Sequence, residues 1–128
     1  GNAMRINEAS ARSGLSQDTI RFYEKSGMLS PIHRDARGWR VFSADDVNWL
    51  CTLERLRVTG MPLDDVKRFA ISAHAPDCNA PKQKAHRLAL LKQHAKTLAE
   101  RQATLEACKQ FLDHKISLYS KTLEVTDG

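Results

Sequence analysis

Residues 16–42 read SQDTIRFYEKSGMLSPIHRDARGWRVF, and this stretch decides the fold. Small polar residues open it and lead into Ile20, which predicts a helix capped at Ser16 and ending near Gly27. One face of so short a helix has to pack on a core. We expect two side chains on the core face and three near the exposed side, namely Ile20 and Phe22 inside and Thr19, Arg21 and Tyr23 outside. An exposed arginine between hydroxyl-bearing residues suits contacts with phosphates and base edges.

The second half of the stretch predicts a basic β-hairpin. Pro31 prevents the helix from continuing, residues 32–34 suit a short strand, and residues 39–42 return as a second strand. The connection contains the Asp and Gly residues that turns favour. Three arginines recur at a spacing of three, at Arg34, Arg37 and Arg40. Beside a recognition helix they suit a phosphate clamp, and the alternative is a solvated hairpin tip.

Helices are predicted on both sides of this stretch. Asn7 is the expected cap of a short first helix, which a glycine ends before the helix capped at Ser16 begins. A helix-turn-helix of this kind places its second helix in the major groove of DNA, although two packed helices occur in any small helical domain. A third helix is expected after a cap at Ser43, and a fourth after Pro62. Arg57, near the end of the third, is a weaker candidate for DNA contact or a solvated helix end.

The composition fits one small domain with an extended arm. The chain has 128 residues, 41% of them apolar, and a net charge of +5. This charge is spread along the chain and is weak evidence for an anionic partner when taken alone. No apolar run reaches membrane-spanning length, no signal peptide opens the sequence, and three cysteines without disulfide spacing favour the reducing cytoplasm. No catalytic set of side chains is evident, so we expect neither an enzyme nor a cofactor or metal site.

A continuous helical pattern runs from Pro81 to about Glu124. Its apolar residues recur at alternating steps of three and four, which is typical of a coiled-coil seam. The expected seam consists of Leu88, Leu91, Ala95, Leu98, Leu105, Leu112, Ile116 and Tyr119. Such a helix is roughly 60 Å long, too long to fold back on so small a domain. Self-association as a homodimer, with the helices antiparallel or crossed about a two-fold axis, is the simplest way to cover the seam.

Several short motifs follow one another in a characteristic order: Ile6-Asn7-Glu8-Ala9, Thr19-Ile20-Arg21-Phe22-Tyr23-Glu24, Gly27-Met28-Leu29, Gly38-Trp39-Arg40 and Gly60-Met61-Pro62-Leu63. In this order they resemble the MerR family of bacterial transcription regulators, over residues 4 to about 70. The departures are Asn7, where the family usually has Gly, and Phe42, where Tyr is common. The pattern from Arg87 to Tyr119 more closely resembles a subgroup linked to aldehyde and thiol stress.

The resemblance implies a mainly α fold, in which a winged helix-turn-helix domain with a small β-hairpin wing precedes a long dimerisation helix. It also implies a homodimer that binds a promoter pseudo-palindrome and distorts the spacer DNA for RNA polymerase. The residues that match the family's DNA contacts are Ser16, Thr19, Arg21, Phe22, Tyr23, Arg34, Arg37, Gly38, Trp39, Arg40 and Arg57. The alternative class is a coiled-coil protein-interaction module that does not bind DNA.

The expected domain boundaries follow from these features. Residues 1–3 look like a cloning remnant, residues 4–72 form the DNA-binding domain, residues 73–81 form a linker or effector loop, residues 82–124 form the coiled-coil helix, and residues 125–128 are a tail.

The effector candidates are Cys78, Cys51 and His74. Thiolate and imidazole are ligands for soft metals, and metal-sensing relatives carry a cysteine near the place of Cys78. Cys51 lies one turn before the place at which the thiol-stress subgroup carries a reactive cysteine. The alternative for Cys51 is a small buried core residue.

Overall fold

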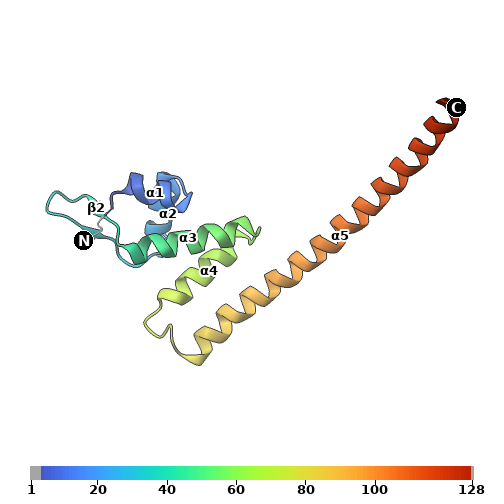
Figure 1. The fold of residues 1–128 in the computed structure, drawn as a ribbon. Helices are drawn as coiled ribbons and strands as arrows, with labels where there is room; N and C mark the ends of the chain where they lie inside the picture. Colours follow the sequence, from blue (N-terminus) through green and yellow to red (C-terminus); the bar gives the residue numbers. More distant parts are fainter. Residues whose placement is uncertain (1–3, 128) are drawn as a thin grey trace. The chain divides into compact units, whose positions relative to one another are not determined.

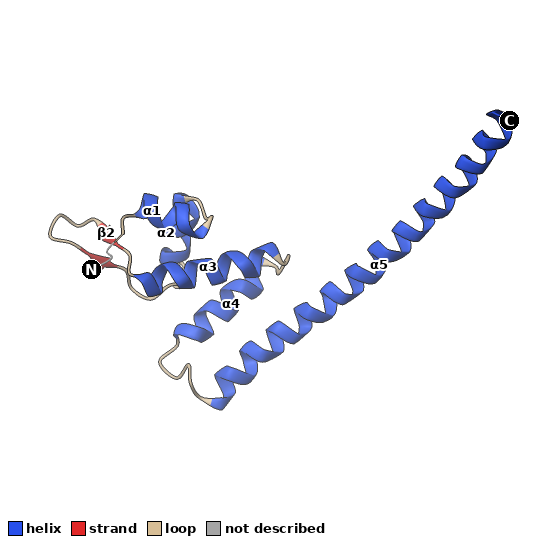
Figure 2. Ribbon diagram, viewed as in Figure 1, coloured by secondary structure: helices blue, strands red, loops and turns tan. Residues whose placement is uncertain are grey.

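A computed structural model describes residues 4–127 of the chain, which are mainly helical. The elements in chain order are α1 (Ile6–Ser13), α2 (Gln17–Lys25), β1 (His33–Arg34), β2 (Arg40–Val41), α3 (Ala44–Val58), α4 (Leu63–His74) and α5 (Pro81–Asp127) (Figures 1 and 2). The predicted fold class, with a small hairpin and a long C-terminal helix, is confirmed. The chain divides after Leu91 into two compact units. The first contains α1–α4, the hairpin and the first turns of α5, and the second is the remainder of α5.

The helix-turn-helix forms at the predicted place. α1 begins at Ile6 and has no side-chain cap, so the predicted cap at Asn7 is wrong, since Asn7 lies inside the first turn. The helix ends at Gly14, whose φ of 79° lies in the left-handed region that glycine adopts without strain. α2 follows at once, and the Ser16 side chain accepts a hydrogen bond from the backbone N–H of Thr19 at 3.1 Å, as the cap prediction requires.

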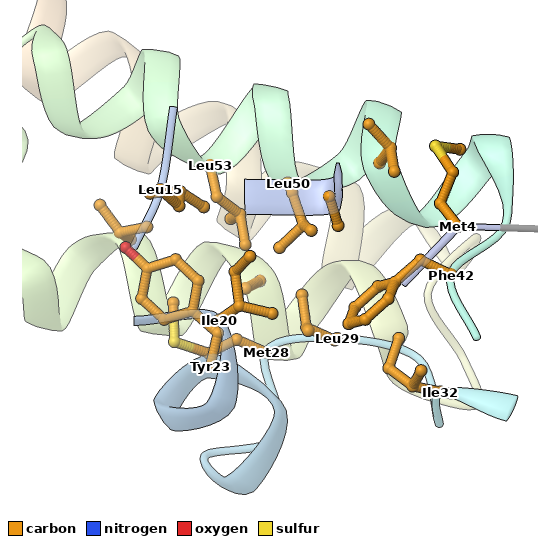
Figure 3. Packing of buried hydrophobic residues seen from close by; sticks show 14 of the residues in the cluster. Met4, Leu15, Ile20, Tyr23, Met28, Leu29, Ile32, Phe42, Leu50 and Leu53 are labelled. Atoms are coloured by element: carbon orange, nitrogen blue, oxygen red, sulfur yellow. The ribbon is translucent and has the colours of Figure 1, made fainter. Parts of the chain in front are cut away.

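The core joins the first four helices to the base of the hairpin. Its largest fully buried side chains are Tyr23, Phe42, Ile20, Met28, Leu50, Leu53 and Val66. In Figure 3, Tyr23 and Leu15 lie at one end of this cluster, while Met4, Phe42 and Ile32 lie at the other. The apolar residues of the stretch that decides the fold therefore hold both α2 and the hairpin on one core.

The hairpin is antiparallel, and its strands are shorter than predicted. His33 pairs with Val41 and Arg34 pairs with Arg40. Phe42 instead exchanges backbone hydrogen bonds of 3.0 and 2.7 Å with Met4, so a third segment continues the pairing at the base. Strands of two residues cannot stand alone. The hairpin therefore depends on contacts with the rest of the domain.

α3 starts with a capping box. The Ser43 hydroxyl accepts a hydrogen bond from the Asp46 N–H at 3.1 Å, and the Asp46 carboxylate accepts one from the Ser43 N–H at 2.9 Å. Further along α3, the indole N–H of Trp49 donates to the Met28 carbonyl at 2.8 Å, and its ring meets that of His74 edge-on at 4.8 Å. Trp49 thus connects the segment after α2 with the end of α4.

α5 starts at Pro81, as predicted, and its first turns are fastened to the end of α4. The Arg87 guanidinium donates to the Ser72 carbonyl at 3.0 Å and to the Cys78 carbonyl at 2.8 Å. Gln83 adds a hydrogen bond of 2.7 Å between its side-chain oxygen and the Ser72 hydroxyl. These bonds join the end of α4 and the loop after it to the first turns of α5. No helix in the described part of the chain is both long and apolar enough to cross a membrane.

Candidate nucleic-acid interface

The outer side of α2 presents the side chains expected of a recognition helix. Arg21 is exposed and is held along the helix by Asp18 at 3.1 Å and by the Gln17 side-chain oxygen at 3.3 Å. Ser16 is exposed and donates its hydroxyl to the half-buried Thr19 hydroxyl at 2.8 Å. Arg21 and Ser16 are therefore exposed and Thr19 is half-buried beside them, and their contacts with DNA stay a prediction.

The two aromatic residues of α2 exchange their predicted positions. Tyr23 is only 1% exposed and belongs to the core, whereas Phe22 is 47% exposed. Residues three apart share a helix face, so Tyr23 lies beside Ile20, while Phe22 points elsewhere. Burial raises the pKa of Tyr23, and the nearby Arg57 guanidinium opposes this rise. The expectation that Tyr23 is exposed is wrong, and Phe22 is the aromatic side chain at this surface.

The hairpin carries a basic surface, and an acidic residue organises its tip. Arg34, Arg37, Gly38 and Trp39 are exposed, and Arg40 is half-buried. The Asp35 carboxylate accepts hydrogen bonds from the backbone N–H groups of Arg37 at 2.9 Å and Trp39 at 3.1 Å. It also pairs with the Arg5 guanidinium at 2.7 Å, and this bond is the main reason why the pKa of Asp35 lies below its usual value. We refer to residues 33–41 as the wing.

The recognition helix and the wing line one open hollow of about 690 Å³. Five of its ten lining residues are arginines. The lining residues are Arg5, Ile6, Asn7, Gln17, Arg21, Arg34, Arg37, Gly38, Trp39 and Arg40. All five predicted wing contacts and Arg21 are thus brought together. Arg5, Asn7 and Gln17 also line the hollow and were not predicted as site residues. Gln17 could have been found from its place in the first turn of α2, but the approach of Arg5 to the wing depends on long-range packing.

Arg57 lies on another part of the same domain. A second, more open hollow of about 390 Å³ is lined by Gly14, Leu15, Ser16, Thr19, Glu54, Arg57 and Val58. The structure therefore places Arg57 with the start of the recognition helix and not with the wing.

The effector candidates are distributed over three elements. Cys51 in α3 is half-buried, and its thiol lies 3.6 Å from the Arg12 carbonyl. Cys78 is half-buried in the connection before α5. His74 directs Nδ1 at the Ala70 carbonyl, 3.0 Å away. Among the described residues, no group of three or more His, Cys, Asp or Glu side chains is arranged to hold a metal ion.

The expected seam of α5 is largely exposed in the single chain. Large apolar side chains at its surface include Leu88, Leu91, Leu98, Leu105, Leu112, Ile116 and Tyr119. Leucine, isoleucine and tyrosine in such a row expose more apolar area than a lone helix normally leaves in water.

A helix-turn-helix with a basic wing and a shared arginine-lined hollow defines a DNA-binding protein of the winged type. The sequence profile of the MerR HTH family regulatory proteins matches residues 4–71. This chain belongs to that family, whose members are transcription regulators.

Relatives with similar sequences are also transcriptional regulators by name. An uncharacterized HTH-type transcriptional regulator of Haemophilus influenzae is 35% identical over 114 residues, which is 89% of this chain and 82% of that protein. The HTH-type transcriptional regulator YfmP of Bacillus subtilis is 30% identical over 127 residues, 98% of this chain and 89% of that protein. Other relatives match over about half of their length, such as HmrR of Rhizobium leguminosarum, 42% identical over 52% of this chain and 50% of that protein. All three are described as HTH-type transcriptional regulators.

A solved structure extends the likeness beyond the DNA-binding domain. HiNmlR, a MerR family regulator lacking the sensor domain, has been crystallised bound to promoter DNA. It aligns with a TM-score of 0.73 at 33% identity, over 93% of this chain and 91% of that one. The alignment therefore includes most of α5.

Proposed function

We propose that this protein binds a promoter pseudo-palindrome as a homodimer in the cytoplasm and activates transcription by distorting the spacer DNA. The observation that carries the proposal is the hollow shared by α2 and the wing, which is lined by five arginines. Guanidinium groups recognise phosphates and guanine edges, and a helix beside them fits the major groove. The promoter-bound HiNmlR supports this assignment, because it aligns with 93% of this chain.

The homodimer is supported by the seam of α5. Its leucines are spaced for a coiled coil and are exposed in the single chain. A second copy of the same helix would cover them and would join two DNA-binding domains. Two domains at a set separation match the two half-sites of a pseudo-palindrome.

Distortion of the spacer follows from this arrangement. Two domains held at a fixed separation select a DNA shape as well as a sequence. Bending a site of 20 to 30 base pairs costs on the order of 1–6 kcal/mol, which contacts with several phosphates can offset. RNA polymerase would then meet promoter elements that the bound dimer has brought into line.

At the level of regulation, the alternative is a thiol- or metal-responsive sensor through Cys78 or Cys51. One observation favours Cys78. Its carbonyl is held by Arg87, so a change in this connection would reach the first turns of α5 directly. At the level of class, the alternative is a coiled-coil interaction module, which predicts no preference for duplex DNA in a filter-binding titration.

Replacement of Arg21 by alanine tests the proposed function. The probe is a duplex selected from a randomised library by the wild-type chain. Loss of one base-edge contact should weaken binding by about ten- to a hundredfold. The matched control is Arg12→Ala, because Arg12 is an exposed arginine of α1 paired with Glu8 at 3.2 Å and does not line the hollow.

Fluorescence anisotropy at several salt concentrations gives both affinity and salt dependence. The control should lose at most a fewfold in affinity, since it removes the same charge from the domain. Equal affinities of the wild-type and Arg21→Ala chains would refute the role assigned to Arg21. Absence of any duplex binding by the wild-type chain would refute the proposed function.

A further inference from the structure

Glu24 lies in the last turn of α2 and faces the wing. Its Oε1 accepts a hydrogen bond from Nε of Arg40 at 2.7 Å and lies 3.7 Å from Nη2 of Arg34. Arg34 and Arg40 are the paired residues of β1 and β2. A single carboxylate therefore contacts both strands of the hairpin, across 16 residues of sequence in the case of Arg40.

The contact brings a negative charge to two arginines that face each other in the hairpin. Like charges directly opposite each other on neighbouring strands repel, and the Arg34–Arg40 pair is such a case. The Glu24 carboxylate offsets this repulsion from the side of α2. The Glu24 and Arg40 side chains are 20% and 25% exposed, so water and salt screen their bond less than they screen a surface pair.

The geometry points to Glu24 as a positioning residue that fixes the wing against the recognition helix, so that both reach the same stretch of DNA. This inference rests on the proposed function, because it presumes that α2 and the wing contact one duplex. Glu24 does not itself contact DNA. It acts through Arg34 and Arg40, whose guanidinium groups it holds beside α2.

The sign of its effect distinguishes this role from simple electrostatics. A carboxylate on a surface that binds phosphates repels them, so its removal should strengthen binding if charge alone mattered. If Glu24 positions the wing, its removal should weaken binding, because the arginines would no longer meet the phosphates in register. The two accounts therefore predict opposite changes in affinity.

The test compares full-length chains in which Glu24 is wild type, Glu24→Gln or Glu24→Ala. The probe is the duplex selected by the wild-type chain, and random-sequence duplex measures non-specific binding. Glu24→Ala should lower specific affinity by about tenfold, the equivalent of one lost charge-assisted hydrogen bond. Glu24→Gln should lose less, since the amide oxygen still accepts a hydrogen bond from Arg40. Non-specific affinity should stay equal or rise.

Glu8→Gln is the matched control. Glu8 is an exposed acid of α1 whose removal changes the net charge by the same amount. Its carboxylate pairs with Arg12 of the same helix at 3.2 Å, whereas that of Glu24 contacts the wing. This variant should bind the selected duplex as tightly as the wild-type chain or slightly more tightly.

Two further measurements separate positioning from a general loss of structure. Phosphate-ethylation interference should lose its signal at the phosphates under the wing and retain it at those around α2. In a double-mutant cycle, Glu24→Ala should have little further effect once Arg40→Ala is present. Thermal melts show which variants are folded. If Glu24→Ala is unfolded, the affinity of Glu24→Gln decides the test.

Three results would overturn the inference. The first is equal or tighter specific binding by the folded Glu24 variants, and the second is additivity with Arg40→Ala. The third is a uniform loss of interference signals over the whole site. Failure of the wild-type chain to bind any duplex would instead overturn the proposed function, and the inference with it.

Discussion

Two adjacent aromatic residues of α2 have opposite environments, and the difference is a matter of helix geometry. Phe22 is exposed and Tyr23 is buried, because Tyr23 follows the core residue Ile20 by three positions. The hydroxyl of Tyr23 has no hydrogen-bond partner within bonding geometry among the described residues. Arg57 nevertheless lies near enough to affect its pKa. Tyr23 therefore belongs to the core and not to the exposed surface of α2.

Tyr23→Phe should leave the affinity for the selected duplex unchanged. It should alter the free energy of unfolding by no more than about 1 kcal/mol, since the hydroxyl it removes makes no full hydrogen bond. Urea denaturation measures the stability, and anisotropy measures the affinity. As a control, Tyr23→Ala should destabilise the protein by about 3–5 kcal/mol because it removes a buried ring. A large loss of affinity in Tyr23→Phe, with stability unchanged, would show that the hydroxyl reaches DNA.

The pKa of Tyr23 gives the same comparison a pH dependence. Burial raises this pKa from 10.0, so the folded state resists ionisation of the phenol. The contribution of Tyr23 to stability is therefore complete below pH 10 and is lost as the pH rises through the folded-state value. The wild-type chain should lose stability more steeply than Tyr23→Phe as the pH rises from 10.0 to the folded-state value.

The role of a residue could be predicted from the sequence when its partners lie a few residues away along the chain. Ser16 and Ser43 were predicted as caps because a cap acts within three residues. The burial of Tyr23 could have been predicted, because it lies three residues after Ile20 on the same helix face. Phe22 was instead expected in the core because its side chain is the more apolar of the two. The contact of Glu24 with Arg40 spans 16 residues and has no local signature.

Among the elements, the wing shows the same division between local and distant causes. Its turn and both strands were predicted from Pro, Gly and alternation, although the strands proved shorter. The attachment of the wing to the rest of the domain was not predicted. It depends on the pairing of Met4 with Phe42 and on the ion pairs made by Glu24 and Arg5. A hairpin so short takes its stability from such contacts. The tip is organised around Asp35, which binds two backbone N–H groups and Arg5.

Asp35→Ala should make the wing tip mobile, whereas Asp35→Asn should not. An asparagine oxygen can still accept from the N–H groups of Arg37 and Trp39, and only the charge pair with Arg5 is lost. Backbone NMR order parameters for residues 35–39 measure the difference and should fall below about 0.6 only in the alanine variant. Equal order in all three chains would show that Asp35 does not organise the tip.

The same carboxylate predicts a pH dependence for the wild-type tip. The Arg5 bond lowers the pKa of Asp35 from 3.8, so the bonds of the tip persist above that value. They are lost as the pH falls through the lower folded-state value. The amide shifts of Arg37 and Trp39 should therefore titrate together below pH 3.8.

For the molecule as a whole, the sequence pattern anticipated α5 but not its attachment. A pattern of steps of three and four from Pro81 onward predicted one long helix, and the structure has it as Pro81–Asp127. The bonds of Arg87 to Ser72 and Cys78 span 15 and 9 residues and could not be read from periodicity. They give the first turns of α5 a fixed direction from α4. The seam further along remains uncovered in one chain, which is why the proposed function needs a second copy.

Leu112→Glu tests that second copy. If α5 pairs along its seam, two glutamates would be buried at symmetry-related places, and the dimer should dissociate at micromolar concentration. His114→Glu is the matched control, since His114 is exposed and lies two residues on, on the opposite side of the helix. Sedimentation velocity should give a single subunit for Leu112→Glu and a dimer for the control and the wild-type chain. Affinity for the selected duplex should fall by about a hundredfold or more in Leu112→Glu alone, because two half-sites are then bound independently. If both glutamate variants remain dimeric, the dimer contact does not run along the predicted seam. If the wild-type chain is itself monomeric, the homodimer is wrong, and a single chain would have to bind DNA through its arginine-lined hollow.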